Sequence, residues 1–222
     1  MRSLRSVPAL AALVAAASLA PAQLSAQPCT TLAGNLVVNC SFEENVLTKS
    51  WDWVATVNGW QSNGTPKKFE LWRGHDGFTS AHGSQHLELD VHDANSNSTI
   101  WQYINTVVGQ EYTVTFSAAH RAGGSGQQYS MVGALIDDVQ RYTTQSLTTH
   151  KQWTTHSFTF TAQNSSTKLG FQALGTQNSY GDHIDNIGVV STVPEPSTYA
   201  LMGAGLLAMG VVARRRRSAT QA

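Results

Sequence analysis

Four side chains able to carry acid–base or metal chemistry recur at every second position of one short run. The run covers residues 85–92, and in a strand period two would place alternate side chains about 7 Å apart along one side. Two imidazoles and two carboxylates can bind a transition metal or transfer protons, although that spacing prevents all four from reaching one ion without help from another strand. The solvent-exposed outer face of a sheet produces the same pattern, and we favour that interpretation. The four residues are His86, Glu88, Asp90 and His92, and the opposite face carries Leu87, Leu89 and Val91.

Three catalytic motifs are absent from the sequence, which has no Gly-x-Ser-x-Gly, no His-Glu-x-x-His and no phosphate-binding loop. Asp137 and Asp138 are carboxylates of the kind that glycosidases pair across a bond. If both belong to a strand, however, adjacent side chains point to opposite faces and cannot flank one bond. The sequence therefore predicts no enzyme.

Aromatic side chains near polar ones form a second kind of candidate site. Carbohydrate-binding proteins stack the apolar face of a sugar ring on exposed aromatic side chains and fix its hydroxyls with amides, carboxylates and Arg. His120 and Arg121 stand beside the Gly-rich segment 122–126. The alternative for Trp72 and Trp101 is a place in the hydrophobic core. The candidate carbohydrate-binding residues are Trp72, Trp101, Tyr129, Tyr180, His120 and Arg121.

An all-β domain is expected to position these residues. From residue 35 to residue 190, short alternating runs are separated by Gly, Asn, Ser and Thr, and no convincing amphipathic helix occurs. At least eight short strands at this spacing predict a two-sheet antiparallel sandwich. The expected strands are residues 36–38, 69–72, 85–92, 100–107, 111–119, 131–136, 153–161, 168–173 and 184–190.

Two details of this fold can be predicted. Residues 100–107 and 111–119 should form a strand pair joined at Gly109-Gln110. In the second strand of that pair, Tyr112, Val114, Phe116 and Ala118 should face the core. The long connection that precedes residue 69 contains three tryptophans, and we expect at least one indole to fill the core. These are Trp51, Trp53 and Trp60.

The N-terminus has the features of a secretory signal. Arg2 and Arg5 precede an apolar run, and small residues allow a cut after Ala22 or Ala26. We favour Ala26, so residues 1–26 are the expected signal peptide and 27–192 the β-sandwich domain. Between Gln27 and Val193, eight Lys and Arg face thirteen Asp and Glu, a formal net charge of −5. An acidic domain repels phosphate backbones, so nucleic acid is excluded as an expected partner.

Cys29 and Cys40 are the only cysteines of the chain. In the oxidising compartment of an exported protein, an even number of cysteines near the mature N-terminus favours a disulfide. The alternative is two separate thiols.

Residues 193–217 carry a further set of signals. Pro194-Glu195-Pro196 cannot continue a helix, and it holds an extended segment before the uncharged run 199–213. As a helix that run would be about 22 Å long, short for a bilayer core of about 30 Å. Cationic flanks stay on the cytoplasmic side, so the four arginines at 214–217 would place the domain outside. This combination near the C-terminus resembles the PEP-CTERM sorting signal.

The resemblance implies a protein that a Gram-negative bacterium exports. It would be held transiently in the inner membrane, recognised and cleaved by an exosortase, and delivered to the cell surface or extracellular matrix, often alongside exopolysaccharide production. The alternative is an ordinary C-terminal membrane anchor that is never cut.

A series of short motifs occurs along the chain at 39–43, Gly59-Trp60, 70–72, 83–89, 100–102, 109–112, Phe116, His120-Arg121 and 185–187. The order of these motifs resembles the galactose-binding-like jelly roll, a superfamily that holds many carbohydrate-binding modules. Members often bind a structural calcium where the two ends of the domain meet, and the matching positions are Glu43 and Asp185. Hard oxygen ligands suit Ca²⁺. The alternative is that Glu43 caps a turn and Asp185 pairs with a surface cation.

Together these features predict an exported, non-catalytic protein that binds polysaccharide in an extracellular matrix. Two other functions stay open, a structural or adhesive surface protein that binds no glycan and, less favoured, a glycan-active hydrolase. An exposed aromatic platform would favour the first function, and a wholly buried set of tryptophans the second. A cleft with two facing carboxylates would favour the hydrolase.

Overall fold

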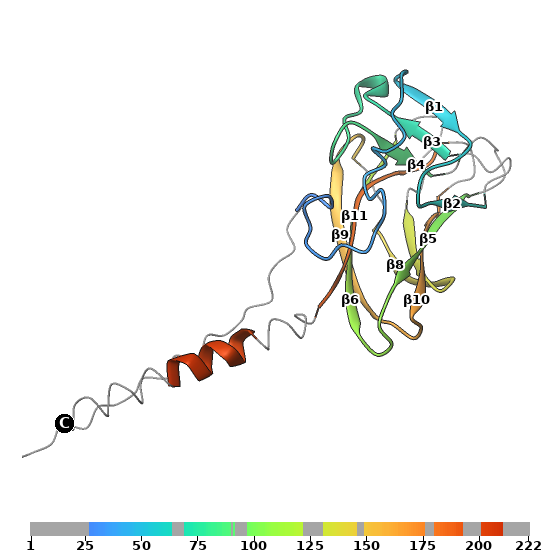
Figure 1. Cartoon of the computed structure of the whole chain (residues 1–222). Helices are drawn as coiled ribbons and strands as arrows, with labels where there is room; N and C mark the ends of the chain where they lie inside the picture. The colour runs from blue at the N-terminus through green and yellow to red at the C-terminus, as the bar shows by residue number, and fades with distance from the viewer. Residues whose placement is uncertain are drawn as a thin grey trace, which may run out of the picture.

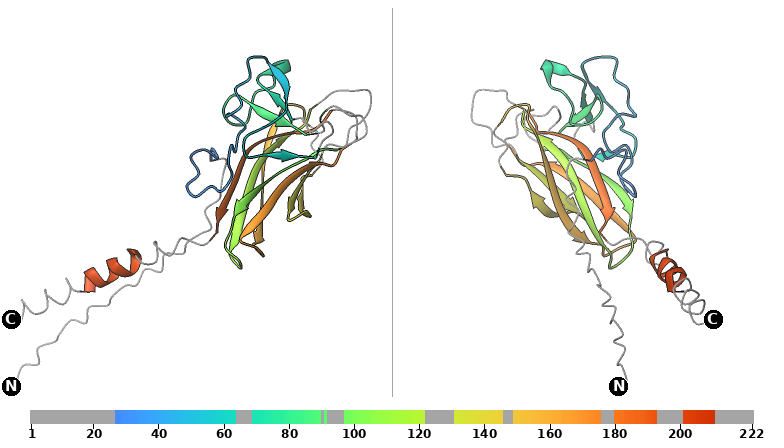
Figure 2. Two further views of the ribbon diagram at one scale, coloured as in Figure 1. Left: turned by 45° about the vertical axis from the view of Figure 1, so that its right-hand side comes forward. Right: turned by 90° about the vertical axis from the view of Figure 1, so that its left-hand side faces the viewer.

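Two antiparallel sheets lie face to face in the computed structural model, which describes residues 27–63, 69–89, 91, 97–121, 131–145, 149–175, 180–192 and 201–210 (Figure 1). The six-stranded sheet has the order β1-β3-β4-β11-β6-β9, and the five-stranded sheet the order β2-β5-β10-β7-β8. Figure 2 shows the same two layers from two further directions. The predicted all-β sandwich is therefore confirmed. The elements are β1 (Trp51–Val54), β2 (Gln61–Ser62), β3 (Phe69–Trp72), the 3₁₀ helix η1 (His75–Gly77), β4 (His86–Glu88), β5 (Thr99–Asn105), β6 (Glu111–Ala119), β7 (Val132–Ile136), β8 (Val139–Thr143), β9 (Trp153–Thr161), β10 (Ser166–Ala173) and β11 (His183–Ser191).

The hydrophobic core lies between the sheets. Phe116 of β6 meets Phe171 of β10 across it, with ring centroids 5.1 Å apart. Alternation along β6 predicted its inward face, and the four expected side chains are buried there. Trp60 is buried beside Phe171, which confirms that one indole of the long connection fills the core.

The predicted pairing of residues 100–107 with 111–119 is wrong. β5 pairs with β2 and β10, whereas β6 pairs with β11 and β9, so the turn at Gly109 crosses from one sheet to the other. Turn residues show where a strand ends, but they do not show whether the next strand pairs with it or lies in the facing sheet.

Residues 36–38 do not form the predicted strand. The Leu36 amide donates to the Val189 carbonyl at 3.0 Å, but the Val38 amide donates at 3.0 Å to the side-chain Oε1 of Gln102. A side chain thus takes the place of a strand carbonyl, and no strand forms over these residues.

Asp137 and Asp138 lie in the tight turn between β7 and β8 and not in a strand, because both have left-handed backbone angles, with φ of 51° and 64°. Asp137 Oδ1 accepts a hydrogen bond from the Lys168 amide, and Asp138 forms an ion pair with the Lys168 ammonium at 2.6 Å. Both carboxylates therefore fix a turn, which agrees with the absence of a glycosidase pair at this position.

The disulfide between Cys29 and Cys40 is present, with a Cα–Cα distance of 6.1 Å. Both cysteines are buried, and the Cys40 carbonyl accepts a hydrogen bond from the Ile187 amide at 2.8 Å. The bridge therefore fastens the N-terminal segment to β11.

The two ends of strand β6 connect to different parts of the chain. At its first residue, the Glu111 carbonyl accepts a hydrogen bond from the amide of Thr192, which directly follows β11. At its other end, Ala119 leads to His120 and Arg121. Residues 201–210 are helical, and within the described part of the chain no helix is long and apolar enough to cross a membrane.

Candidate functional site

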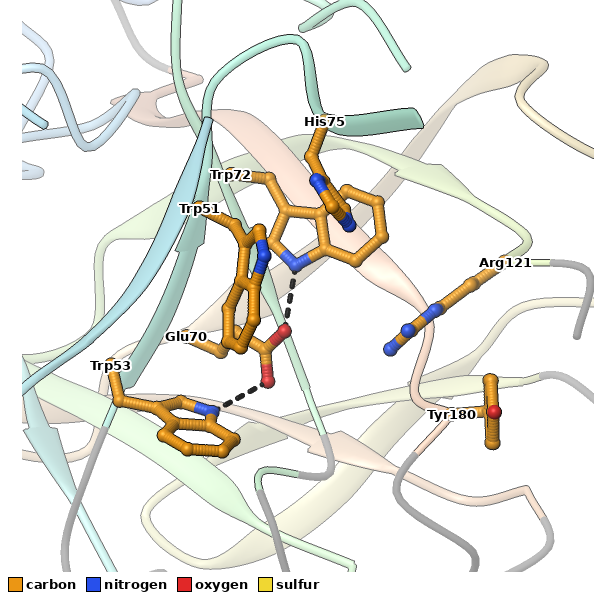
Figure 3. A pocket seen from close by; sticks show the side chains of 7 residues that line it. All are labelled: Trp51, Trp53, Glu70, Trp72, His75, Arg121 and Tyr180. Atoms are coloured by element: carbon orange, nitrogen blue, oxygen red, sulfur yellow. Dashed lines mark hydrogen bonds between the residues drawn. The ribbon is translucent and has the colours of Figure 1, made fainter. Parts of the chain in front are cut away.

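A pocket of about 320 Å³ lies where β1 and β3 pair, at the upper end of the sandwich in Figure 1. Aromatic rings line most of it, and a carboxylate, a guanidinium and an imidazole supply its polar groups (Figure 3). The lining residues are Trp51, Trp53, Glu70, Trp72, His75, Arg121 and Tyr180.

Strand register brings four of these side chains together. Trp51 lies opposite Trp72 and Trp53 opposite Glu70 in the antiparallel β1–β3 pair. Residues directly opposite in such a pair, and residues two apart in one strand, share a face. Three indoles and one carboxylate therefore project from the same side of two short strands.

The carboxylate of Glu70 fixes two of the indoles. Its Oε1 accepts a hydrogen bond from Trp72 Nε1 and its Oε2 one from Trp53 Nε1, both at 2.8 Å. Trp51 packs edge-on against Trp53, with ring centroids 5.2 Å apart. These contacts hold the rings of this wall before any ligand arrives.

Arg121 forms the opposite wall of the pocket (Figure 3). Its guanidinium carbon lies 4.7 Å from the ring centroid of Trp72 and 4.5 Å from that of Tyr180. Its Nη1 donates to Glu88 Oε1 at 2.5 Å, and the same oxygen accepts from the Gly181 amide at 2.9 Å. Glu88 thus holds Arg121 and the backbone beside Tyr180 in place.

Glu88 itself is fully buried behind this wall. Burial, reinforced by the negative charge of the neighbouring Glu70, raises the pKa of Glu88 well above its usual value, although Arg121 opposes the shift. The interpretation of the 86–92 face as a solvent-exposed surface is therefore wrong for His86 and Glu88, both of which are 0% exposed. Asp90 and His92 lie outside the described residues.

A small aromatic cluster explains why that face is covered. Phe78, which directly follows η1, is buried against Trp72, and Trp153 packs on the same group. The alternation of side chains along residues 85–92 identified which of them share a face. It could not show that the segment between β3 and β4 folds back over them.

His86 and His183 lie side by side under this cover, with ring centroids 4.8 Å apart. Burial lowers the pKa of His86 to about 3, and it lowers the pKa of His183 well below its usual value. Both imidazoles are therefore neutral at ordinary pH. Among the residues that the structure describes, no group of three or more His, Cys, Asp or Glu side chains is placed to hold a metal ion.

Residues 35–190 match the family described as "Protein of unknown function (DUF642)". The chain belongs to this family. Residues 192–217, which follow the DUF642 domain directly, match the PEP-CTERM protein-sorting motif. The predicted resemblance of the tail is confirmed, and the motif indicates an exported, surface-sorted protein that an exosortase processes. No curated protein matches the chain.

Several solved carbohydrate-binding modules resemble the DUF642 domain in outline. The xylan-binding domain CBM22-1 from Paenibacillus barcinonensis Xyn10C is 12% identical, covers 73% of this chain and 97% of its own, and gives a TM-score of 0.48. TmCBM61, solved with beta-1,4-galactotriose, is 12% identical and covers 71% and 98%, with a TM-score of 0.45. At these values the likeness does not bear on what this DUF642 domain binds.

The structure brings together three of the six predicted carbohydrate-binding residues. Trp72, Arg121 and Tyr180 line the pocket of the DUF642 domain, with Trp72 buried and Tyr180 39% exposed. His120 lies outside the pocket lining, with Nδ1 3.4 Å from Asp182 Oδ1. Tyr129 lies outside the described residues.

Trp101 lies in the other sheet, on β5, and lines a separate hollow of about 510 Å³ with Trp60 and Phe69. The ammonium of Lys168 lies 4.5 Å from the centroid of its ring. Trp72 and Trp101 therefore do not form one platform.

Sequence reasoning missed Trp51, Trp53, Glu70 and His75 as pocket residues. The signal was nevertheless present, because Trp51-x-Trp53 and Glu70-x-Trp72 each put two chemically matched side chains on one face of a strand. The sequence analysis did not predict that residues 51–54 form a strand, so this signal was not used.

Glu43 and Asp185, the two predicted calcium ligands, both accept hydrogen bonds from the segment 82–85. Glu43 Oε1 accepts from the amides of Ser84 and Gln85, each at 2.7 Å, and Asp185 Oδ2 accepts from the His82 amide at 2.8 Å. These donors by themselves satisfy much of what the two carboxylates require. Within the described residues the pair has no third acidic, His or Cys side chain placed for a metal, so the calcium site stays a prediction.

Proposed function

We propose that this protein is an exported, non-catalytic module that binds polysaccharide in the extracellular matrix through the pocket between Trp53 and Tyr180. The observation that carries the proposal is the pocket lining, in which four aromatic side chains surround a carboxylate and a guanidinium. Apolar rings for stacking combined with a few fixed polar groups are what sugar recognition requires.

The exposed part of the lining supports stacking on a sugar. Trp53 is 37% and Tyr180 39% exposed, so both rings can lose water on contact with a ligand. Glu70 fixes the indole of Trp53, and Arg121 lies on the ring of Tyr180, so little ordering would be needed on binding. The volume falls at the small end of ligand pockets, which fits a single sugar residue or the end of a chain.

The arrangement of the carboxylates supports binding without catalysis. Glycosidases place two carboxyl groups on either side of the bond that they cleave. Glu70 and Glu88 instead lie next to each other on β3 and β4, and Glu88 is buried behind the pocket with Arg121. They cannot flank one glycosidic bond.

The test is retention on immobilised polysaccharides, with protein recovered from the exported fraction of the native host. Trp53→Ala should weaken binding to the cognate polysaccharide about ten- to thirtyfold, the equivalent of about 1–2 kcal/mol for one stacked ring. Tyr103→Ala is the matched control, because Tyr103 is a 60% exposed ring on the other sheet and should not matter.

Two outcomes would overturn the proposal. One is equal retention of wild type and of a normally folded Trp53→Ala variant. The other is the absence of retention on every glycan tested, which would favour a structural or adhesive protein.

A further inference from the structure

The two walls of the pocket differ in how their charges are compensated, which bears on the kind of sugar that the proposed binding function would serve. Glu70 lies in the wall formed with Trp51 and Trp53, and Arg121 lies across from it beside Tyr180 (Figure 3).

The carboxylate of Glu70 has hydrogen-bond donors but no cation. Its two oxygens accept from the neutral indoles of Trp53 and Trp72, and an ionised carboxylate has about four lone-pair sites, so capacity remains. Over the ranges that the structure describes, no Lys or Arg forms an ion pair with Glu70. Its charge is therefore uncompensated within the pocket wall.

Arg121 is in the opposite situation. Glu88 forms an ion pair with it at 2.5 Å, and the rings of Trp72 and Tyr180 both lie within 5 Å of its guanidinium carbon. An anion that enters the pocket meets a guanidinium that already donates to the buried Glu88 carboxyl group and contacts two aromatic rings. An incoming carboxylate would also stand near Glu70.

We infer that the pocket selects sugars that carry a protonated amine, so that its ligand is a polysaccharide of hexosamine units with free amino groups. This inference rests on the proposed polysaccharide-binding function. An ammonium group would donate a charge-assisted hydrogen bond to Glu70, and the faces of Trp51 and Trp53 would attract the same charge. A uronic acid would gain neither contact.

The charge of the whole domain acts in the same direction. Between Gln27 and Val193 the formal net charge is −5, so a polymer with repeated ammonium groups is attracted at long range and a polyuronate is repelled.

The test uses three soluble oligosaccharides of equal length with the exported protein. They are a β-1,4-linked glucosamine oligomer, its fully N-acetylated counterpart and a galacturonic acid oligomer. At mildly acidic pH, where the sugar amine is protonated, calorimetry should give about tenfold tighter binding of the amine oligomer than of its acetylated counterpart, the size of one charge-assisted contact. The galacturonate oligomer should bind weakest.

Glu70→Gln should bring the affinity ratio of amine to acetylated oligomer to about one, since the amide carries no charge. Glu111→Gln removes the same charge at the far end of β6 and should leave the ratio unchanged. In wild type the ratio should fall as rising pH deprotonates the amine, a readout that needs no variant and therefore survives a folding defect in Glu70→Gln.

The outcomes separate this inference from the proposed function. Equal affinity for the amine and acetylated oligomers, or tighter binding of the galacturonate oligomer, would overturn the amine preference. If the oligomers that bind wild type no longer bind Trp53→Ala, the pocket would still be the binding site. If none of the three oligomers binds, and wild type and Trp53→Ala are retained equally on immobilised polysaccharides, the proposed function itself fails.

Discussion

Glu70 and Glu88 lie directly opposite each other on β3 and β4, and yet they have opposite surroundings. Glu70 borders the pocket and accepts hydrogen bonds from two neutral indoles, whereas Glu88 is fully buried and bound to Arg121. This cross-strand pair thus supplies one carboxylate that lines the pocket and one buried carboxyl group that positions the opposite wall.

Glu88 should make the fold less stable as the pH rises. Its pKa in the folded state is raised above the usual 4.5, so above that pH the unfolded chain releases a proton that the folded chain still holds. Glu88→Gln resembles the protonated form and lacks this effect. The melting temperature of the variant relative to wild type should therefore increase from about pH 4 to about pH 8. A difference that stays constant over this range would contradict a titrating Glu88.

The histidine pair should have the opposite pH dependence. The pKa values of His86 and His183 are lowered in the folded state, so below the usual value of 6.5 the unfolded chain binds protons that the folded chain excludes. Each group should cost up to about 1.4 kcal/mol of stability per pH unit as the pH falls. His183→Leu should make denaturant unfolding less sensitive to acid than in wild type. The prediction fails if both proteins lose stability in parallel.

Gly83→Ala should destabilise the domain more than Gly74→Ala does. Both glycines have left-handed backbone angles, with φ of 71° and 67°, so both substitutions should cost about 1–2 kcal/mol from the backbone alone. A Cβ at Gly83 would also lie 2.4 Å from Glu43 Oε1, whereas one at Gly74 meets nothing within 4 Å. The amides of Ser84 and Gln85 hold that carboxylate, so the contact should add about 1–3 kcal/mol. Urea unfolding of the two variants gives the difference directly, and equal losses would contradict it.

Calcium binding at Glu43 and Asp185 can be tested by thermal unfolding. A cation that binds only the folded state would stabilise it by about 2.7 kcal/mol at a hundredfold excess over Kd. The prediction expects a higher melting temperature in calcium than in EDTA, and the rise should disappear in Glu43→Gln. An unchanged melting temperature in wild type would contradict calcium binding. The amides of segment 82–85 would then be the partners of both carboxylates.

The sorting motif predicts that the exported protein lacks Arg214 to Arg217, because an exosortase removes the tail. Intact-mass measurement of the protein from its native host should give a mass below that of residues 27–222 by at least the mass of residues 214–222. Recovery of the complete tail on the exported protein would contradict processing.

The sequence predicted what depends on local pattern. Alternation gave the inward face of β6 from Tyr112 to Ala118, the bounds of β9 and the sandwich class, because all of these follow from period two. It did not predict β8, whose residues are mostly exposed and carry no hydrophobic alternation. The partners of β5 and β6 also depend on how the whole chain is arranged.

The pocket was only partly predictable for the same reason. Arg121, Trp72 and Tyr180 could be chosen by residue type, but their meeting depends on Glu88, which the sequence placed on an exposed face. Phe78 and Trp153 cover His86 on the same strand, and Arg121 and the Gly181 amide contact Glu88. No pattern within residues 85–92 indicates these long-range contacts.

The two ends of β6 give the domain a direction. Nine strand residues span about 30 Å, with the Glu111 end bound to Thr192 and the other end leading to Arg121 in the pocket wall. Residue 192 therefore lies about one strand length from the pocket wall, so a tether attached beyond this residue would join the domain at the end of β6 opposite the pocket.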